Sequence, residues 1–210
     1  MSDDFEQAKS RVCQSEGAYV TMRPLVSSWE QRKLGEIGSI ETGNTPDTTN
    51  PSFYCLKGTP WITPTDIKES LDLCAEKSLS DLGVAVARTV PAGSILCTCI
   101  ASIGKNAITR FTCGFNQQIN ALTPKFDLYD PYFLFAESKL WSAQMKRSAA
   151  AGTMQIVNKR EFASIGTFVP SLIEQRLIGG YFSCLDSLIT LHQREPLHTM
   201  KEGKNDNRYQ

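Results

Sequence analysis

Residues 171–195 constrain this chain most, because they predict one long amphipathic helix. Ser171 and Glu174 have the S-x-x-E spacing of a capping box, in which each side chain satisfies a free backbone N–H at the helix start. Pro196 is expected to end the helix, since the residue before a proline is disfavoured in helical geometry. At 1.5 Å per residue, such a helix is roughly 35 Å long.

Two tracks of mainly apolar side chains run along this helix in alternating steps of four and three residues. One track is Leu177, Tyr181, Cys184, Leu188 and Leu191, and the other is Ile178, Phe182, Leu185, Ile189 and His192. Together they make a stripe wider than a two-stranded coiled-coil seam. The stripe indicates either a helix in the core of its own domain or an assembly helix that meets other chains. The expected assembly contacts are Leu177, Ile178, Tyr181, Phe182, Leu185, Leu188 and Ile189.

Two adjacent glycines interrupt the stripe. Gly179 and Gly180 each weaken an isolated helix by roughly 1 kcal/mol relative to alanine. They indicate either a close approach of another backbone or a weak point in the helix.

The bulk composition is that of an ordinary globular protein. A length of 210 residues suits one domain with an appendage, or two small domains, and 41% hydrophobic residues can fill a core. No apolar run is long enough to span a membrane, and the polar N-terminus is unlike a secretory signal. The seven cysteines are irregularly spaced, which favours reduced thiols in the cytoplasm.

No metal site is expected. Cys97 and Cys99 share one face of an expected strand, but a CxC pair alone is weak evidence for zinc. The histidines, His192 and His198, lie far along the chain.

The net charge is zero, but it is unevenly distributed. Residues 101–160 carry 8 basic and 3 acidic side chains, a net of +5, whereas residues 1–100 carry 9 and 13, a net of −4. The middle of the chain can therefore present a basic face to phosphates. The alternative is that these are ordinary solvated side chains.

The pattern along the chain predicts a mixed α/β (α+β) domain over residues 29–170. It follows a poorly ordered arm at 1–28 and precedes the helix at 171–195 and a polar tail at 196–210. Turn residues over 43–60 indicate a long loop. Strands are expected within 92–101, 107–111, 118–122 and 165–170. Asp130 and Pro131 are expected to start a helix ending near Gly152, with a stripe of Phe133, Ala136, Leu140 and Ala143.

Motifs of catalysis are missing from the sequence. It has no GxxxxGK[ST] or GxGxxG loop, no GxSxG elbow and no HExxH pair. The DPYF sequence at Asp130 is similar to a motif of amino-methyltransferases. It lies where a helix cap is expected and no glycine-rich cofactor loop precedes it, so we interpret it as structural. No catalytic residue and no cofactor are expected in this chain.

Several segments, in order, match one family. They are WEQRKLGEI from Trp29, GNTP from Gly43, PWITPTDI from Pro60, ASIGK from Ala101, FNQQINALTP from Phe115, GTMQ from Gly152, VPSLIEQ from Val169 and CLDSLITLHQR from Cys184. Together they resemble the specificity subunits of type I restriction-modification systems. The resemblance covers residues 29–194.

This resemblance implies a DNA-reading target recognition domain for one half of a split double-stranded site, with a long helix that binds methyltransferase subunits. It also implies a restriction/translocase subunit in the same complex, and S-adenosylmethionine, ATP and Mg²⁺ on those partner subunits. Family members have two recognition domains and two helical regions, so this chain resembles a half subunit. It departs from the family at Pro196, where the helix usually continues, so a truncated or silent cassette is also open.

Amide, hydroxyl and basic side chains are the groups that read base edges and phosphates. The candidate DNA contacts are Thr45, Lys57, Thr63, Thr65, Lys105, Asn106, Lys146, Arg147, Thr153, Gln155, Asn158, Lys159 and Arg160. About half are expected to contact DNA, mostly at phosphates.

Each candidate has a structural alternative. Asn158 can form a capping box with Glu161, Lys146 and Arg147 can complement a helix C-terminus, and Asn116 and Gln117 can hold a turn.

Three hypotheses follow. The first is a non-catalytic DNA-reading subunit. The second is an interaction module that forms a homodimer through its helix and does not bind DNA. The third is an enzyme, the recognition part of a split DNA methyltransferase with catalysis in this chain, which the missing cofactor motif disfavours.

Overall fold

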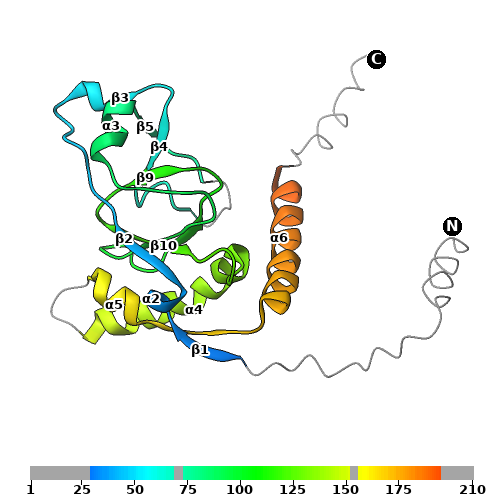
Figure 1. The fold of residues 1–210 in the computed structure, drawn as a ribbon. Helices are drawn as coiled ribbons and strands as arrows, with labels where there is room; N and C mark the ends of the chain where they lie inside the picture. The colour runs from blue at the N-terminus through cyan, green and yellow to red at the C-terminus, as the bar shows by residue number, and fades with distance from the viewer. Residues whose placement is uncertain (1–28, 69–72, 152–155, 195–210) are drawn as a thin grey trace, which may run out of the picture.

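An antiparallel sheet of four strands lies at the centre of the computed structural model, which describes residues 29–68, 73–151 and 156–194 (Figure 1). The expected arm at 1–28 and tail at 196–210 lie outside these residues. In spatial order the strands are β2 (Gly38–Thr42), β10 (Ile119–Pro124), β7 (Ile95–Thr98) and β8 (Asn106–Ile108).

Both faces of this sheet are buried, each in a separate core. Ile95 and Cys97 of β7 belong to one core and Leu96 to the other. Across the register, Ile95 faces Leu122 and Leu96 faces Ala121, so each pair lies on one face. A strand that is covered on both faces has a continuous apolar sequence. This is why the apolar run within residues 92–101 predicts the strand that the structure has as β7.

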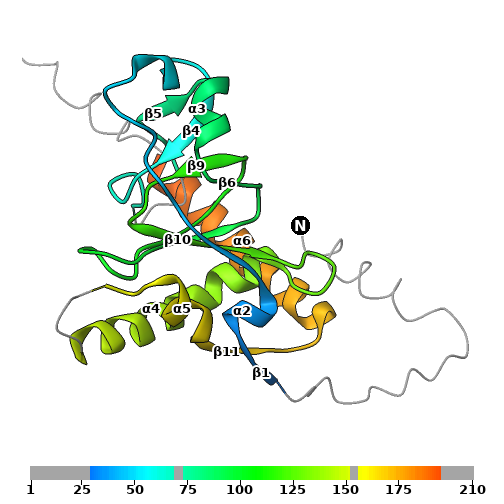
Figure 2. The same cartoon turned by 60° about the vertical axis from the view of Figure 1, so that its left-hand side comes forward.

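Helices and a two-stranded ribbon cover one face of the sheet (Figure 2). These elements are β1 (Glu30–Lys33), α2 (Leu34–Ile37), α4 (Pro131–Ala151), α5 (Lys159–Ser164) and β11 (Gly166–Val169). The ribbon is the antiparallel pair β1 and β11. Asp130 caps α4 as expected, since its carboxylate accepts a hydrogen bond from the backbone N–H of Phe133 at 2.8 Å.

The apolar stripe predicted for α4 is partly wrong. Phe133 is buried, but Leu140 is 60% exposed and Ala143 is exposed as well. The buried side includes Trp141 and Met145 together with two serines, Ser138 and Ser142. The serines can be buried because their hydroxyls donate to carbonyl oxygens of α4 itself, and a search for apolar periodicity does not count them.

A second sheet, of five short strands, packs over the other face and forms the head of the molecule, at the top of Figure 1. In spatial order its strands are β3 (Tyr54–Cys55), β5 (Lys77–Leu79), β4 (Thr59–Ile62), β9 (Cys113–Phe115) and β6 (Thr89–Val90). The 3₁₀ turn η1 (Pro51–Phe53) and the helix α3 (Asp81–Val86) complete it.

The prediction of one long loop over residues 43–60 is wrong in part, because this segment contains η1, β3 and the start of β4. These elements are too short to give a period of their own. Tertiary contacts hold them instead, among them the edge-to-face contact of Tyr54 with Trp61, whose ring centroids are 6.2 Å apart.

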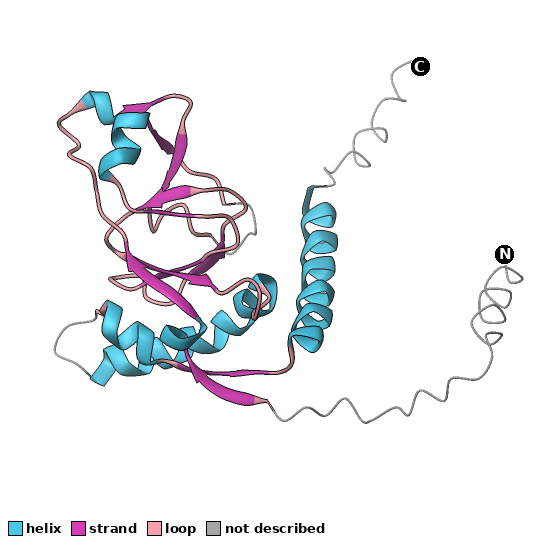
Figure 3. Ribbon diagram, viewed as in Figure 1, coloured by secondary structure: helices cyan, strands magenta, loops and turns pink. Residues whose placement is uncertain are grey.

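The C-terminal helix α6 (Leu172–Arg194) projects along one side of the molecule (Figure 3). The backbone N–H of Glu174 donates to the hydroxyl of Ser171 at 3.4 Å, as the expected cap requires. The helix packs mainly against α4. Within the described residues, no helix is both long and apolar enough to cross a membrane.

Candidate nucleic-acid interface

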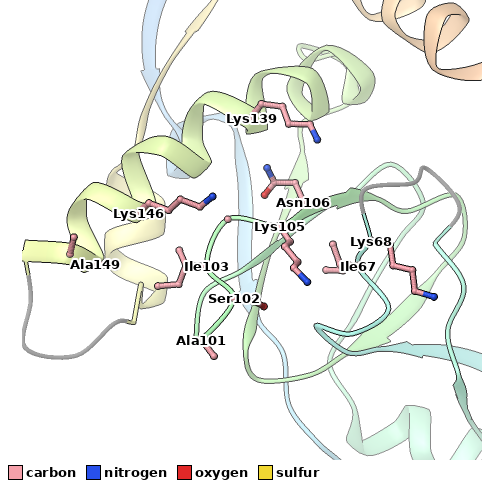
Figure 4. Close-up of a pocket in the computed structure, with 12 residues that line it drawn as sticks. Ile67, Lys68, Ala101, Ser102, Ile103, Lys105, Asn106, Lys139, Lys146 and Ala149 are labelled. Carbon is pink, nitrogen blue, oxygen red and sulfur yellow. The ribbon is translucent and has the colours of Figure 1, made fainter. Parts of the chain in front are cut away.

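A hollow of about 600 Å³ opens between α4, the turn that joins β7 to β8, and the segment that follows β4 (Figure 4). Its walls are formed by Ile67, Lys68, Ala101, Ser102, Ile103, Gly104, Lys105, Asn106, Lys139, Lys146, Ala149 and Ala150. We call this site the lysine hollow, because its lining, among the residues that the structure describes, has four lysines and no acidic side chain.

The four lysines come from three separate segments. Lys139 and Lys146 lie on the α4 wall, seven residues or about 10 Å apart along the helix (Figure 4). Lys105 belongs to the β7–β8 turn, and Lys68 follows β4 on the opposite wall. Folding therefore gathers positive charge that the sequence distributes over almost 80 residues.

A glycine and a buried threonine hold the β7–β8 turn against α4. Gly104 has a φ of +86°, and a Cβ added there would lie 2.9 Å from the Cβ of Ser142. The Thr98 hydroxyl donates to the carbonyl of Ser102 at 2.5 Å and accepts from the N–H of Lys105 at 3.0 Å. Lys105 is thus presented from a fixed backbone.

No carboxylate of the described residues lies within ion-pair distance of the four lysines. The ion pairs found there join Arg32 to Glu30 and, at 3.5 Å, Lys159 to Glu41. Several unpaired ammonium groups around one hollow create a local positive potential. Such a potential suits a strand of phosphates, since neutralising them releases condensed counterions.

Three of the predicted DNA contacts, Lys105, Asn106 and Lys146, line this hollow, and two lining lysines, Lys68 and Lys139, were missed. Lys139 could have been found, because it precedes Lys146 by two helical turns on a helix that the sequence predicts. Lys68 has no such signal, because only tertiary folding brings it opposite α4.

Asn106 is a correction to the predicted contacts. Its side chain is only 8% exposed, and its amide nitrogen donates to the carbonyl of Ser138 and the hydroxyl of Ser142, both at 2.7 Å. Its amide oxygen is buried as well. Asn106 therefore holds β8 against α4 and does not present an amide to a base.

Thr63 and Thr65 surround a buried carboxylate. The backbone N–H and the hydroxyl of Thr63 both donate to Asp66 at 2.7 Å, and Asp66 is only 3% exposed. The hydroxyl of Thr65 lies 2.7 Å from that of Thr63. These bonds fix the turn after β4 and leave Thr65 as the more exposed hydroxyl of the two.

Thr45 and Lys57 lie in the head segment. The hydroxyl of Thr45 bonds to the side chain of Gln117 and accepts from the amide of Asn116 at 3.2 Å. Asn116 also accepts from the N–H of Gln118 at 2.8 Å, so the alternative that it holds a turn is confirmed. Lys57 is exposed in the turn between β3 and β4.

The remaining predicted contacts that the structure describes lie on or beside two helices, α4 and α5. Asn158 and Glu161 form the capping box of α5, each bonding the other's backbone N–H at 3.0 Å. Arg160 is exposed on the same helix as Lys159. Thr153 and Gln155 lie outside the described residues.

Arg147 is exposed on α4 and does not line the lysine hollow. Lys146 and Arg147 precede the last turn of α4, which has no basic residue, so a role confined to the helix C-terminus is not supported.

The apolar stripe of α6 faces away from the domain. Its members Leu177, Tyr181 and Leu188 are 64%, 65% and 57% exposed. Phe182, Leu185 and Ile189 are exposed as well, whereas Ile178 is half-buried and packs against the core. The helix does not bury this stripe in its own domain, so the core-helix interpretation fails and the assembly interpretation stands as a proposal.

Besides Ile178, the side of α6 that contacts the domain carries polar and small side chains. Gln175 accepts from the N–H of Asp130 at 3.0 Å, and Asp186 accepts from the Tyr132 hydroxyl at 2.7 Å. Burial, together with this bond, raises the pKa of Tyr132. A Cβ on Gly179 would overlap the carboxylate of Asp130 and lie 2.8 Å from the nitrogen of Phe133. The close approach predicted at the glycine pair is therefore confirmed for Gly179.

The CxC pair is part of the core. Cys97 and Cys99 are 0% and 3% exposed and belong to the same cluster. Burial raises the pKa of Cys97 well above its usual value and that of Cys99 to about 12. In the part of the chain that the structure describes, no three acidic, cysteine or histidine side chains gather as a metal site would require.

Comparison with known proteins identifies the family. A family model described as "Type I restriction modification DNA specificity domain" matches residues 26–198. The chain is 30% identical over 175 residues to the HindI specificity subunit of Haemophilus influenzae, covering 79% of this chain and 38% of that protein. It is 28% identical over 171 residues to the MjaIX specificity subunit of Methanocaldococcus jannaschii, covering 79% and 39%. The chain thus spans less than half the length of these curated relatives.

Solved structures share the fold. The HsdS subunit from Thermoanaerobacter tengcongensis aligns with a TM-score of 0.62 at 21% identity, over 91% of this chain and 45% of that one. The S subunit from M. genitalium aligns with a TM-score of 0.64 at 14% identity, over 92% and 48%. The expected mixed α/β domain with a long C-terminal helix is confirmed. The boundaries 29–170 and 171–195 remain predictions.

These matches confirm the resemblance to type I restriction-modification specificity subunits that the ordered sequence segments indicate. The chain belongs to the family of type I restriction-modification DNA specificity domains.

Proposed function

We propose that this chain reads one half of a split DNA target within a type I restriction-modification complex and docks methyltransferase subunits through α6. The observation that carries the DNA-reading role is the lysine hollow, which Lys68, Lys105, Lys139 and Lys146 line with no acidic side chain among the other described lining residues. In a chain of this family, a cluster of cations with no described carboxylate in ion-pair range suits the phosphates of duplex DNA.

The lysine hollow positions DNA, and other side chains specify its sequence. Phosphate contacts set register and orientation but carry no direct sequence information. Exposed groups such as Thr65, in the turn after β4, are available to reach base edges. Because the whole chain has no net charge, we expect it to bind weakly alone and more tightly when partner subunits add phosphate contacts.

The partner surface is the exposed stripe of α6. Exposed apolar side chains over several turns of one helix are typical of a protein interface. Methyltransferase subunits are the proposed occupants, with a restriction/translocase subunit in the same complex. S-adenosylmethionine, ATP and Mg²⁺ would be held by those partners.

Salt dependence tests the lysine hollow directly. Binding of the full chain to a short duplex is measured by fluorescence anisotropy over a range of salt concentrations. Each lysine that neutralises one phosphate contributes about 0.9 to the slope of log K against log salt. We expect Lys139→Ala and Lys146→Ala each to lower the slope by about that amount and to weaken binding equally for all sequences.

Lys33→Ala is the matched control, because Lys33 is an exposed lysine in β1, at the far end from the head. Its slope should equal that of the unmodified chain. Slopes that stay unchanged in both hollow variants would remove the lysine hollow from the DNA interface.

The second candidate is a helix-mediated homodimer without DNA binding, and the exposed stripe of α6 is the observation that favours it. Light scattering over a range of concentrations distinguishes a monomer from a dimer. A dimer that also binds DNA predicts a palindromic split target, because half-sites mirror the symmetry of the protein. A dimer without salt-dependent DNA binding would favour this second candidate.

A further inference from the structure

Leu56 is the most exposed large apolar side chain in the described part of the chain. It is 101% exposed, whereas the next, Ile173, is 69% exposed. It lies in the turn between β3 and β4, at the top of the head (Figure 1). Single exposed apolar residues are common on protein surfaces. A leucine that contacts nothing at the tip of a projecting turn is less easily explained by the fold.

The turn that carries Leu56 has a fixed shape. The thiol of Cys55 donates to the carbonyl of Lys57 at 3.2 Å, closing the turn on itself. A Cβ on Gly58 would overlap the carbonyl oxygen of Leu79, so the backbone there is in close contact with β5.

The base of the hairpin is anchored as well. The hydroxyl of Tyr54 donates to the carbonyl of Pro46 at 2.8 Å, and the indole N–H of Trp61 donates to the carbonyl of Asn44 at 3.3 Å. Leu56 is therefore held out on a preorganised support.

The residue types at the tip of this turn are those of a DNA contact and not those that turns favour. Turns favour Gly, Pro, Asn, Asp and Ser, which adopt their dihedral angles or bond their own backbone. Here an apolar side chain is followed by an exposed lysine, Lys57. DNA-binding proteins use this combination, with a cation on the phosphates and an apolar side chain against bases or thymine methyl groups.

We propose that Leu56 is a base-contacting, specificity-determining residue, and that Lys57 beside it contacts a phosphate. The proposal rests on the proposed DNA-reading function and adds to it a residue that no polar or charge criterion selects. Replacing Leu56 and replacing Lys57 should therefore affect DNA binding differently. Loss of a base contact weakens binding to some DNA sequences, whereas loss of a phosphate contact weakens binding to all of them alike.

The test selects bound duplexes from a pool with a randomised block, at low salt, using the full chain and sequencing the bound fraction. We expect Leu56→Ala to lose sequence preference at one or two adjacent base pairs. It should bind the duplex enriched by the unmodified chain about tenfold more weakly. Leu56→Met should keep the preference. Lys57→Ala should weaken binding to all sequences and lower the salt slope by about 0.9.

Leu82→Ala is the matched control, since Leu82 is a second exposed leucine of the head, on α3. It should leave preference and affinity unchanged. If Leu56→Ala keeps the original preference and affinity while the unmodified chain binds DNA, the role of Leu56 is overturned and the proposed function stands. If the unmodified chain shows no salt-dependent binding, the proposed function fails and the role of Leu56 fails with it.

Discussion

At the scale of single residues, Gly179 and Gly180 are adjacent but have opposite surroundings. A Cβ on Gly179 would overlap Asp130, the residue that caps α4, whereas nothing lies within 4 Å of a Cβ on Gly180. The two glycines carry the same helix penalty. One permits the contact between α6 and α4, and nothing in the structure explains the other.

Replacing each of the two glycines with alanine should change the free energy of unfolding in opposite directions. Gly179→Ala should lower the free energy of unfolding by about 1–3 kcal/mol, because α6 or the Asp130 cap must shift. Gly180→Ala should raise it by up to about 1 kcal/mol, because alanine favours the helix and meets no neighbour. Urea unfolding followed by circular dichroism measures both. Equal effects of the two variants would contradict the packing described for Gly179.

At the scale of elements, α6 has two functional sides. Gln175, Gly179 and Asp186 recur at helical spacing on the side that contacts the domain. Leu177 and Leu188 lie on the other side and are more than half exposed. The helix is therefore attached through polar and close-packed contacts, which leaves the apolar stripe available to a partner.

The stripe can be altered without harming the fold. Leu177→Glu combined with Leu188→Glu should change the free energy of unfolding by no more than about 0.5 kcal/mol, because both side chains are exposed. Association with the methyltransferase subunit, or with a second copy, should be lost, since charges cannot be buried in an apolar contact. Co-purification and light scattering measure the loss.

Ser187→Glu serves as the control, because it adds a charge at an exposed position outside the stripe. It should leave assembly intact. Retained assembly in the double variant would mean that the stripe is not the interface.

At the scale of the whole molecule, one sheet belongs to two cores. Buried thiols lie in both, Cys97 and Cys99 in the core beside α4 and Cys113 in the core beneath the head. Burial raises the pKa of Cys113 to about 12, as it does for Cys99. Because the two cores share β7 and β10, we expect the head and the helical layer to unfold together.

These thiols make stability depend on pH. Their pKa values are higher in the folded state, so above the usual thiol pKa the unfolded chain releases protons that the folded chain keeps. Below about pH 8 the protonated thiols make their full contribution to the free energy of unfolding. As the pH rises above that value, the free energy of unfolding falls by about 1 kcal/mol per pH unit for each thiol. Urea unfolding between about pH 8 and pH 10 should therefore show stability falling with pH.

Cys97→Ala should reduce this pH dependence, while Cys184→Ala, at an exposed position on α6, should not change it. Equal dependence in both variants would contradict a role for the buried thiol.

The sequence by itself determined the elements whose signals are local. The cap at Asp130, the capping box at Asn158, the doubly buried run at β7 and the long amphipathic helix all follow from neighbouring residues. It also determined the family, because ordered segments over most of the chain match it. Lys105 and Lys146 could be selected because each lies in or near a predicted turn or helix end.

Features that depend on contacts between residues far apart in the sequence were decided only by the tertiary structure. The short strands of the head have no period of their own, so the sequence of residues 43–60 resembles a loop. Strands β3 and β4 form there because both pair with the distant strand β5. Lys68 joins the lysine hollow only because the segment after β4 folds opposite α4. The amide of Asn106 is not offered to a base, because that same helix holds and buries it. The direction of the α6 stripe was open for the same reason. An amphipathic pattern shows that a helix has an apolar side, and packing alone decides whether that side turns toward its own domain or toward another chain.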